Sequence, residues 1–151
     1  MAIDYCCFAN TDYTAGECRK FLVRDLGLVI ARSRPPDWLE NEATTVIVQD
    51  CDPAQHQVLA DMFGFAPRIS ILMRPVLSAR WIESGMQTIV RVVDCMLRNT
   101  EGDIGFSVEY ERVLLLRRGN TVQIRDDFDE RLGRGLESLI SLPSQSKSFS
   151  P

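Results

Sequence analysis

The sequence predicts a single α+β domain, with helices packed on a sheet face and a mixed or mainly antiparallel sheet. Three observations indicate this class. Apolar residues recur at three- and four-residue steps along residues 79–97, as in an amphipathic helix. Residues 104–125 alternate apolar and polar side chains around a Gly119-Asn120 pair, which is typical of a β-hairpin. Helical and β-branched segments also follow each other through short connections in the first half of the chain.

Local signals place the elements of the first half. Strands are expected at residues 3–9, 28–32, 43–49 and 68–74. Thr14 followed by Glu17 has the spacing of a capping box, so a helix begins there and stops at Gly27. Asp52, followed by a proline, favours the start of a second helix, which we expect to end at Gly64.

The second half reads as a long helix and a three-stranded meander. The helix is broken at residues 100–103, where Gly102 can take the left-handed conformation that ends helices. The meander strands are expected at residues 104–110, 112–118 and 121–125. Leucines at helical spacing follow, although Gly133 and Gly135 weaken that helix. The predicted domain is residues 1–140, and residues 141–151 form a flexible Ser/Pro-rich tail.

Composition limits the partners. The 17 basic and 21 acidic residues give a net charge of -4, which argues against binding to nucleic acid and is compatible with a basic partner. The first residues lack the basic start and apolar run of a signal peptide, and no apolar stretch has the length of a membrane span. We therefore expect a cytoplasmic protein that does not associate with membranes.

The cysteines and the lone histidine do not form a recognisable site. Five cysteines without a CxxC pair are typical of small buried hydrophobic side chains, so we expect neither a metal nor a cofactor. His56 is more simply a surface residue of a helix than a catalytic base. Phosphate loops, nucleophile elbows and HExxH motifs are absent from the sequence.

Two charged groups admit alternative interpretations. Asp50 with Asp52, and the acidic run at residues 126–130, could hold a cation or transfer protons, but such carboxylates more often cap helices or lie in solvated turns. Arg117 and Arg118, with Arg112 and Arg125 nearby, could bind an anion. Protection of a strand edge from aggregation is the simpler interpretation of these arginines.

The segment at residues 33–42 is predicted to be an irregular polar loop, because two adjacent prolines favour an extended path. Trp38 lies there among carboxylates, as an aromatic anchor for a partner would. The alternative is that its ring folds back over the sheet edge. The candidate partner-binding residues are Asp37, Trp38, Glu40, Glu42, Asp50 and Asp52.

The back half of the chain resembles small bacterial immunity proteins of the Sit type. The resemblance rests on Phe63-Gly64-Phe65-Ala66-Pro67 before a strand, Leu97-Arg98 at a helix end, Gly102-Asp103, and Leu114 to Asn120 in the meander; the opening Met1-Ala2-Ile3-Asp4-Tyr5 is also similar. It implies a small protein that protects its producing cell by binding a cognate toxin stoichiometrically. It transfers no functional residue, because the matching positions belong to the scaffold.

Three functions remain open from the sequence. The first is a non-enzymatic immunity protein that occludes a basic toxin, with acidic groups steering the encounter. The second is a carboxylate-dependent hydrolase that uses Asp50, Asp52 or the acidic run at residues 126–130. The third is an assembly module that associates through the edge of the meander.

Overall fold

The computed structural model describes residues 3–32, 34, 35 and 37–147. Its strands are β1 (Tyr5–Ala9), β2 (Val29–Ile30), β3 (Trp38–Glu40), β4 (Thr44–Asp50), β5 (Ile69–Pro75), β6 (Ile104–Val108), β7 (Arg112–Arg118), β8 (Thr121–Arg125) and β9 (Ser144–Lys147). The helices are α1 (Ala15–Leu26), α2 (His56–Phe63), α3 (Ile82–Asn99) and α4 (Phe128–Leu132), with short 3₁₀ turns η1 (Pro53–Gln55) and η2 (Leu136–Leu139). Within the described residues, nine strands form one sheet in the order β2-β3-β4-β5-β1-β6-β7-β8-β9.

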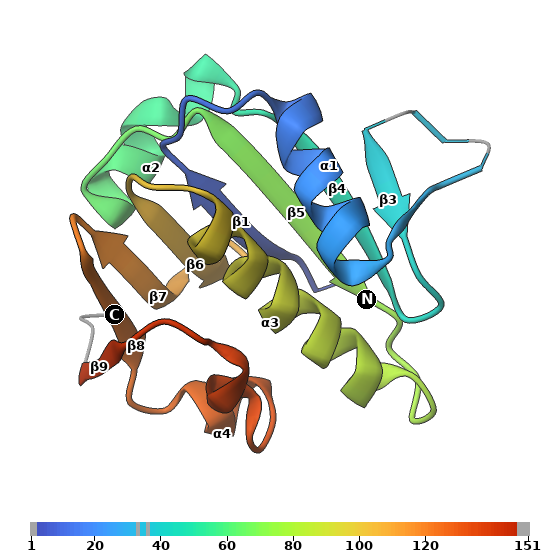
Figure 1. Ribbon diagram of the computed structural model, residues 1–151. Coiled ribbons are helices and arrows are strands. Elements are labelled where there is room, and N and C mark those ends of the chain that lie inside the picture. Colours follow the sequence, from blue (N-terminus) through green and yellow to red (C-terminus); the bar gives the residue numbers. More distant parts are fainter. Residues whose placement is uncertain (1–2, 33, 36, 148–151) are drawn as a thin grey trace.

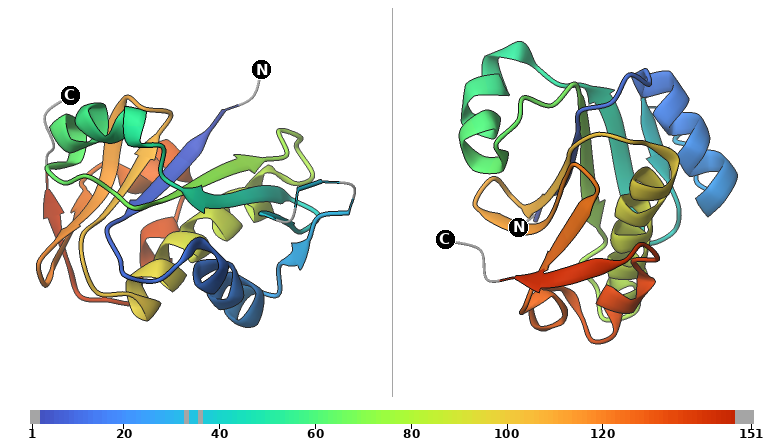
Figure 2. Two further views of the ribbon diagram at one scale, coloured as in Figure 1. Left: turned by 90° about the horizontal axis from the view of Figure 1, so that it is seen from above. Right: turned by 60° about the vertical axis from the view of Figure 1, so that its left-hand side comes forward.

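The predicted α+β class is confirmed, and the helices cover both faces of the sheet. Helices α1 and α3 pack on one face, which we call the α3 face, while α2 lies on the opposite α2 face (Figures 1 and 2). All strand pairs are antiparallel except the parallel pair of β8 and β9. The sheet therefore has an apolar core on each side, with the larger one beneath α1 and α3.

The predicted caps of the first two helices are present. The backbone N–H of Glu17 donates to Oγ1 of Thr14 at 3.1 Å, and the Thr14 N–H donates to the Glu17 carboxylate at 3.0 Å. Gly27 ends α1 and Gly64 ends α2 in the left-handed conformation. Asp52 accepts from the N–H of Ala54 and so caps η1. These interactions connect residues close in sequence, which is why they could be predicted.

The long helix and its predicted break are confirmed. The stripe of Met86, Ile89, Val93 and Met96 is buried against the sheet. The helix ends at Asn99 before an extended Thr100, and Gly102 takes the left-handed conformation, with a φ of 89°, two residues later. A side chain from β7 also binds the last carbonyls of the helix, which the sequence did not indicate.

Two other segments differ from the sequence expectations. Residues 38–40, inside the predicted irregular loop, form β3, because they pair with residues 45–47 of β4 and bury Leu39 on the α3 face. Residues 144–147, inside the predicted tail, form β9 beside β8. The leucine-rich segment is divided into α4 and η2, with positive φ at both Gly133 and Gly135.

Candidate functional site

The acidic segment around Trp38 lies on a part of the α2 face that α2 does not reach. The register aligns Trp38 of β3 with Ile47 of β4 and Leu72 of β5, which gives an apolar row across three strands. Helix α2 packs instead over Phe8 of β1 and its neighbours towards β7. Figure 2 (left) shows α2 above one half of the sheet, with the other half of this face uncovered by any helix. Ile47 is buried and Leu72 packs against the core beneath α2, so Trp38 is the member of this row that remains half-exposed. We call Trp38 with its flanking Asp37 and Glu40 the open face.

Trp38 is half-buried, and a cation lies over its ring. The guanidinium carbon of Arg34 is 5.0 Å from the ring centroid, within the range of a cation–π contact. Asp37 accepts a hydrogen bond of 2.6 Å from Nε2 of Gln49, a residue of the same face of β4. Carboxylates and one arginine thus surround the aromatic side chain, where the sequence indicated carboxylates alone.

The other three predicted contact residues do not join the open face. Glu42 is exposed in the turn between β3 and β4. Asp50 follows the alternation of Val46 and Val48 onto the α3 face, where it lines a hollow with Arg19 and Arg68. Asp52 caps η1 at the end of the sheet. Asp37, Trp38 and Glu40 are therefore the predicted residues that the structure brings together.

Two carboxylates of the acidic run at residues 126–130, Asp127 and Asp129, stabilise the local chain. Asp127 accepts from Arg125 and from Arg131, each at 2.6 Å. Asp129 accepts from the backbone N–H groups of Gly135 and Glu137. These contacts match the interpretation of the run as turn and helix-end carboxylates.

Arg117 has a structural role that the sequence interpretation missed. Its side chain is buried on the α3 face and donates to the carbonyl oxygens of Leu97 and Thr100, at 2.8 and 3.0 Å. It also donates to the carbonyl of Gly102 at 2.8 Å. The guanidinium thus satisfies carbonyls at the negative end of the α3 dipole. Edge protection is wrong for Arg117, because β7 lies inside the sheet and this side chain points into the core.

The cysteines are buried, as predicted, and all five are free thiols. Burial raises the pKa of Cys6 to about 12 and that of Cys18 to about 11, so both remain protonated near neutral pH. His56, which the sequence places on a helix surface, is the first residue of α2 and is half-buried. Its Nε2 is buried and lacks a hydrogen-bond partner among the described residues.

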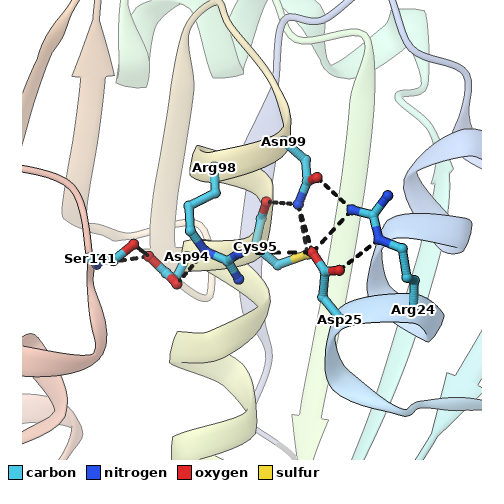
Figure 3. Close-up of polar contacts among 7 residues, drawn as sticks. All are labelled: Arg24, Asp25, Asp94, Cys95, Arg98, Asn99 and Ser141. Atoms are coloured by element: carbon cyan, nitrogen blue, oxygen red, sulfur yellow. Dashed lines mark hydrogen bonds and ion pairs between the residues drawn. The ribbon is translucent and has the colours of Figure 1, made fainter.

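A polar cluster between α1 and α3 was not foreseen from the sequence (Figure 3). Its centre is Asp25, whose carboxylate accepts from Nε of Arg24 at 2.7 Å and from Nδ2 of Asn99 at 2.9 Å. The thiol of Cys95 lies 3.5 Å from the same carboxylate. The hydrogen bond from Arg24, followed by that from Asn99, lowers the pKa of Asp25 well below its usual range.

A second carboxylate extends this cluster to the segment after η2. Asp94 is buried, and it accepts from Nε of Arg98 at 2.9 Å and from the backbone N–H and hydroxyl of Ser141, both at 2.9 Å. Figure 3 shows Arg98 between the two carboxylates, and its Nη1 is 3.9 Å from Asp25. The cluster thus joins α1, α3 and the chain leading to β9.

The polar cluster links α1, α3 and the segment after η2 by hydrogen bonds, and we call it the structural bracket. Burial, with the nearby Asp25 charge second, raises the pKa of Cys95 to about 12, so the thiol is a poor nucleophile. Both carboxylates already accept several hydrogen bonds. Those to Asp25 stabilise its charged form, lower its pKa and so weaken it as a base. No group of three or more metal-ligating side chains occurs in the described ranges. Among those residues, no helix has the length and apolar character that crossing a membrane requires.

Comparison with known proteins identifies the family. The comparisons with curated proteins and with solved structures found no match. The sequence model of the SitI3-like family matches residues 3–130, which span the sheet from β1 to β8 and include both the open face and most of the polar cluster. The resemblance of the back half to Sit-type proteins therefore extends through most of the chain, which belongs to the SitI3-like family of Sit-type immunity proteins.

Proposed function

We propose that this protein is an immunity protein that binds a cognate bacterial toxin and neutralises it by stoichiometric occlusion. Membership of the SitI3-like family is the observation that carries the proposal. Side-chain contacts support it, because Asp52 caps a helix, Asp127 forms two ion pairs and the five thiols are buried. Its mechanism is to block the active site of the toxin or the approach of its substrate.

We propose the open face as the contact surface for the toxin. The half-exposed ring of Trp38, next to the buried Ile47, supplies an apolar centre, while Asp37 and Glu40 supply negative charge at its border. Interfaces concentrate binding energy in such aromatic side chains, and surrounding polar residues exclude water from them. Glu42, in the adjoining turn, extends the acidic border, whereas Asp50 and Asp52 lie away from this surface.

The net negative charge of the chain also supports binding to a basic toxin. The chain carries a net charge of -4, so its field attracts a basic partner and raises the rate of encounter. A basic toxin surface would meet the carboxylates of Asp37 and Glu40. Arg34, which stacks on Trp38, would then have to leave the ring or remain at the border of the interface.

The contacts of the carboxylates favour this function over the enzymatic alternative. A hydrolase built on Asp50 and Asp52 needs both carboxylates in one pocket. Asp50 lines a hollow with Arg19 on the α3 face, whereas Asp52 caps η1 with its side chain. The acidic run is likewise used for ion pairs and backbone hydrogen bonds.

Toxin binding by single variants tests the proposal. The purified cognate toxin is titrated with the full chain and with the Trp38→Ala and Glu40→Lys variants. We expect a 1:1 complex with the unaltered chain, and affinity reduced by about 30-fold for Trp38→Ala. Trp81→Ala is the matched control, because an arginine also stacks on that ring, at 4.8 Å from its centroid. Unchanged affinity in both open-face variants would remove this surface from the proposal.

A further inference from the structure

A groove lies on the α3 face of the sheet edge, behind the open face. It is formed where α1 crosses the ends of β2 and β3, with a volume of about 380 Å³. This volume is within the range of sites that bind small molecules or partner side chains. The residues that line it are Gly16, Arg19, Lys20, Val23, Arg24, Ile30 and Leu39.

The floor of the groove is apolar, and its two main side chains are exposed. Ile30 has 62% of its surface exposed and Val23 has 41%. Ile30 pairs with Leu39 in the β2–β3 register, so both point to the α3 face, whereas the neighbouring Val29 points to the face of Trp38. Strand β2 is an edge strand, since no further strand pairs with its outer side in the described chain. Its valine and its isoleucine therefore point to opposite faces of an exposed sheet edge.

The border of the groove is basic, and the lining residues include no carboxylate. Arg24 pairs with Asp25 at 2.7 Å, so its charge is largely compensated. Arg19 donates to the carbonyl of Val48 at 2.7 Å, and neither Arg19 nor Lys20 forms an ion pair among the described residues. The groove surface itself is mainly apolar, so these two side chains line it chiefly with their aliphatic stems and place their charges at its border, without a carboxylate partner among the described residues.

We propose that this groove takes an acidic segment of the toxin, with an apolar side chain placed on Val23 and Ile30 and a carboxylate near Lys20 and Arg19. The inference rests on the proposed toxin-binding function and adds a second contact to it. Charge complementarity selects an acidic segment over a basic one. A second copy of this chain fits poorly through the same groove, because the lining residues include no carboxylate that could meet the cations of the other copy.

The two surfaces give the sheet edge opposite charge on its two sides. Carboxylates border the face of Trp38, and cations border the face of Ile30. A toxin that binds around the β2–β3 edge of the sheet contacts Val29 and Trp38 on one face and Ile30 and Val23 on the other. The sign of the charge on each side then fixes the orientation of the complex.

The test uses the full chain and the purified cognate toxin. Ile30→Asp and Lys20→Glu are compared with Val58→Asp, a matched control because Val58 lies on α2 and is 61% exposed. We expect both groove variants to lose about tenfold or more in affinity and Val58→Asp to bind as the unaltered chain does. Lys20→Arg should retain binding, and circular dichroism of each variant confirms that it is folded.

The outcomes separate this inference from the proposed function. If Trp38→Ala weakens binding while Ile30→Asp and Lys20→Glu do not, the groove proposal is overturned and the immunity function stands. If Ile30→Asp weakens binding but Lys20→Glu does not, the acidic character of the segment is overturned. If light scattering shows a dimer that Ile30→Asp converts to a monomer, the groove belongs to self-association and the proposal fails. If the unaltered chain does not bind the toxin, both proposals fail.

Discussion

The carboxylate of Asp25 on α1 accepts a hydrogen bond from the thiol of Cys95 on α3, with 3.5 Å between oxygen and sulfur. This contact lies at the centre of the structural bracket between the two helices. Asn99 binds the same carboxylate one turn further along α3. Only 18% of the Asp25 side chain is exposed, although its partner Arg24 lies at the surface. The bracket therefore fixes α1, which forms one wall of the proposed groove, relative to the rest of the core.

Removing the charge of Asp25 should loosen this bracket. We expect Asp25→Asn to lower the free energy of unfolding by about 1–2 kcal/mol, because charge-assisted hydrogen bonds to Arg24 and Asn99 are lost. Urea denaturation measures the change. Asp12→Asn is the control, since the Asp12–Arg68 ion pair is fully exposed on the Asp12 side and should change stability little. Equal effects of the two variants would contradict the bracket.

The same carboxylate makes stability depend on pH in a defined direction. The folded protein holds the pKa of Asp25 below its unfolded value, so the contribution is complete above about pH 4 and is lost as the pH falls further. The difference in unfolding free energy between the unaltered chain and Asp25→Asn should therefore stay constant between about pH 6 and about pH 4, and shrink as the pH falls below about 4. A difference that grows as the pH falls would be inconsistent with this assignment.

Arg117 should be the most costly arginine of the chain to replace. Arg117→Met leaves the carbonyls of Leu97, Thr100 and Gly102 without their donor inside the core, and we expect a loss of about 3 kcal/mol or more. Arg112→Met, at the exposed end of the same strand, is the control and should change stability by less than about 0.5 kcal/mol. A loss of under about 1 kcal/mol for Arg117→Met would show that the guanidinium does not hold the end of α3.

Gly105 is required by the packing of α2 on the sheet. A Cβ at this position would overlap the ring of Phe63, so Gly105→Ala should destabilise the protein by about 1–3 kcal/mol. A second change, Phe63→Leu, should recover part of the loss. Gly16→Ala is the control, because a Cβ there meets only ordinary contacts within α1 and should be neutral or stabilising. Gly105→Ala with unchanged stability in thermal unfolding would contradict the packing of Phe63 on β6.

Local sequence signals were enough to predict much of this fold. The capping box of Thr14 and Glu17, the Asp52 cap and the Gly119-Asn120 turn all depend on residues within a few positions of one another. Strand β3 was missed because its stability comes from β4 and from burial of Leu39, neither of which the local pattern reveals. The central place of β1, between β5 and β6, likewise depends on the packing of the whole chain.

The candidate sites were less accessible to sequence reasoning. Asp25 binds residues 70 and 74 positions away, and Arg117 binds carbonyls 15 to 20 positions away. No spacing pattern could have connected these residues. Trp38 could be singled out because it is an aromatic residue among carboxylates, but the alternation of β3 was needed to separate its face from that of Ile30.

Titration calorimetry of the full chain against its purified cognate toxin is the decisive measurement. We expect a 1:1 complex that abolishes the activity of the toxin, with Trp38→Ala weakening the complex by about 30-fold and Trp81→Ala leaving it unchanged. The immunity function is refuted if no complex is detected, or if the toxin remains active when the chain saturates it.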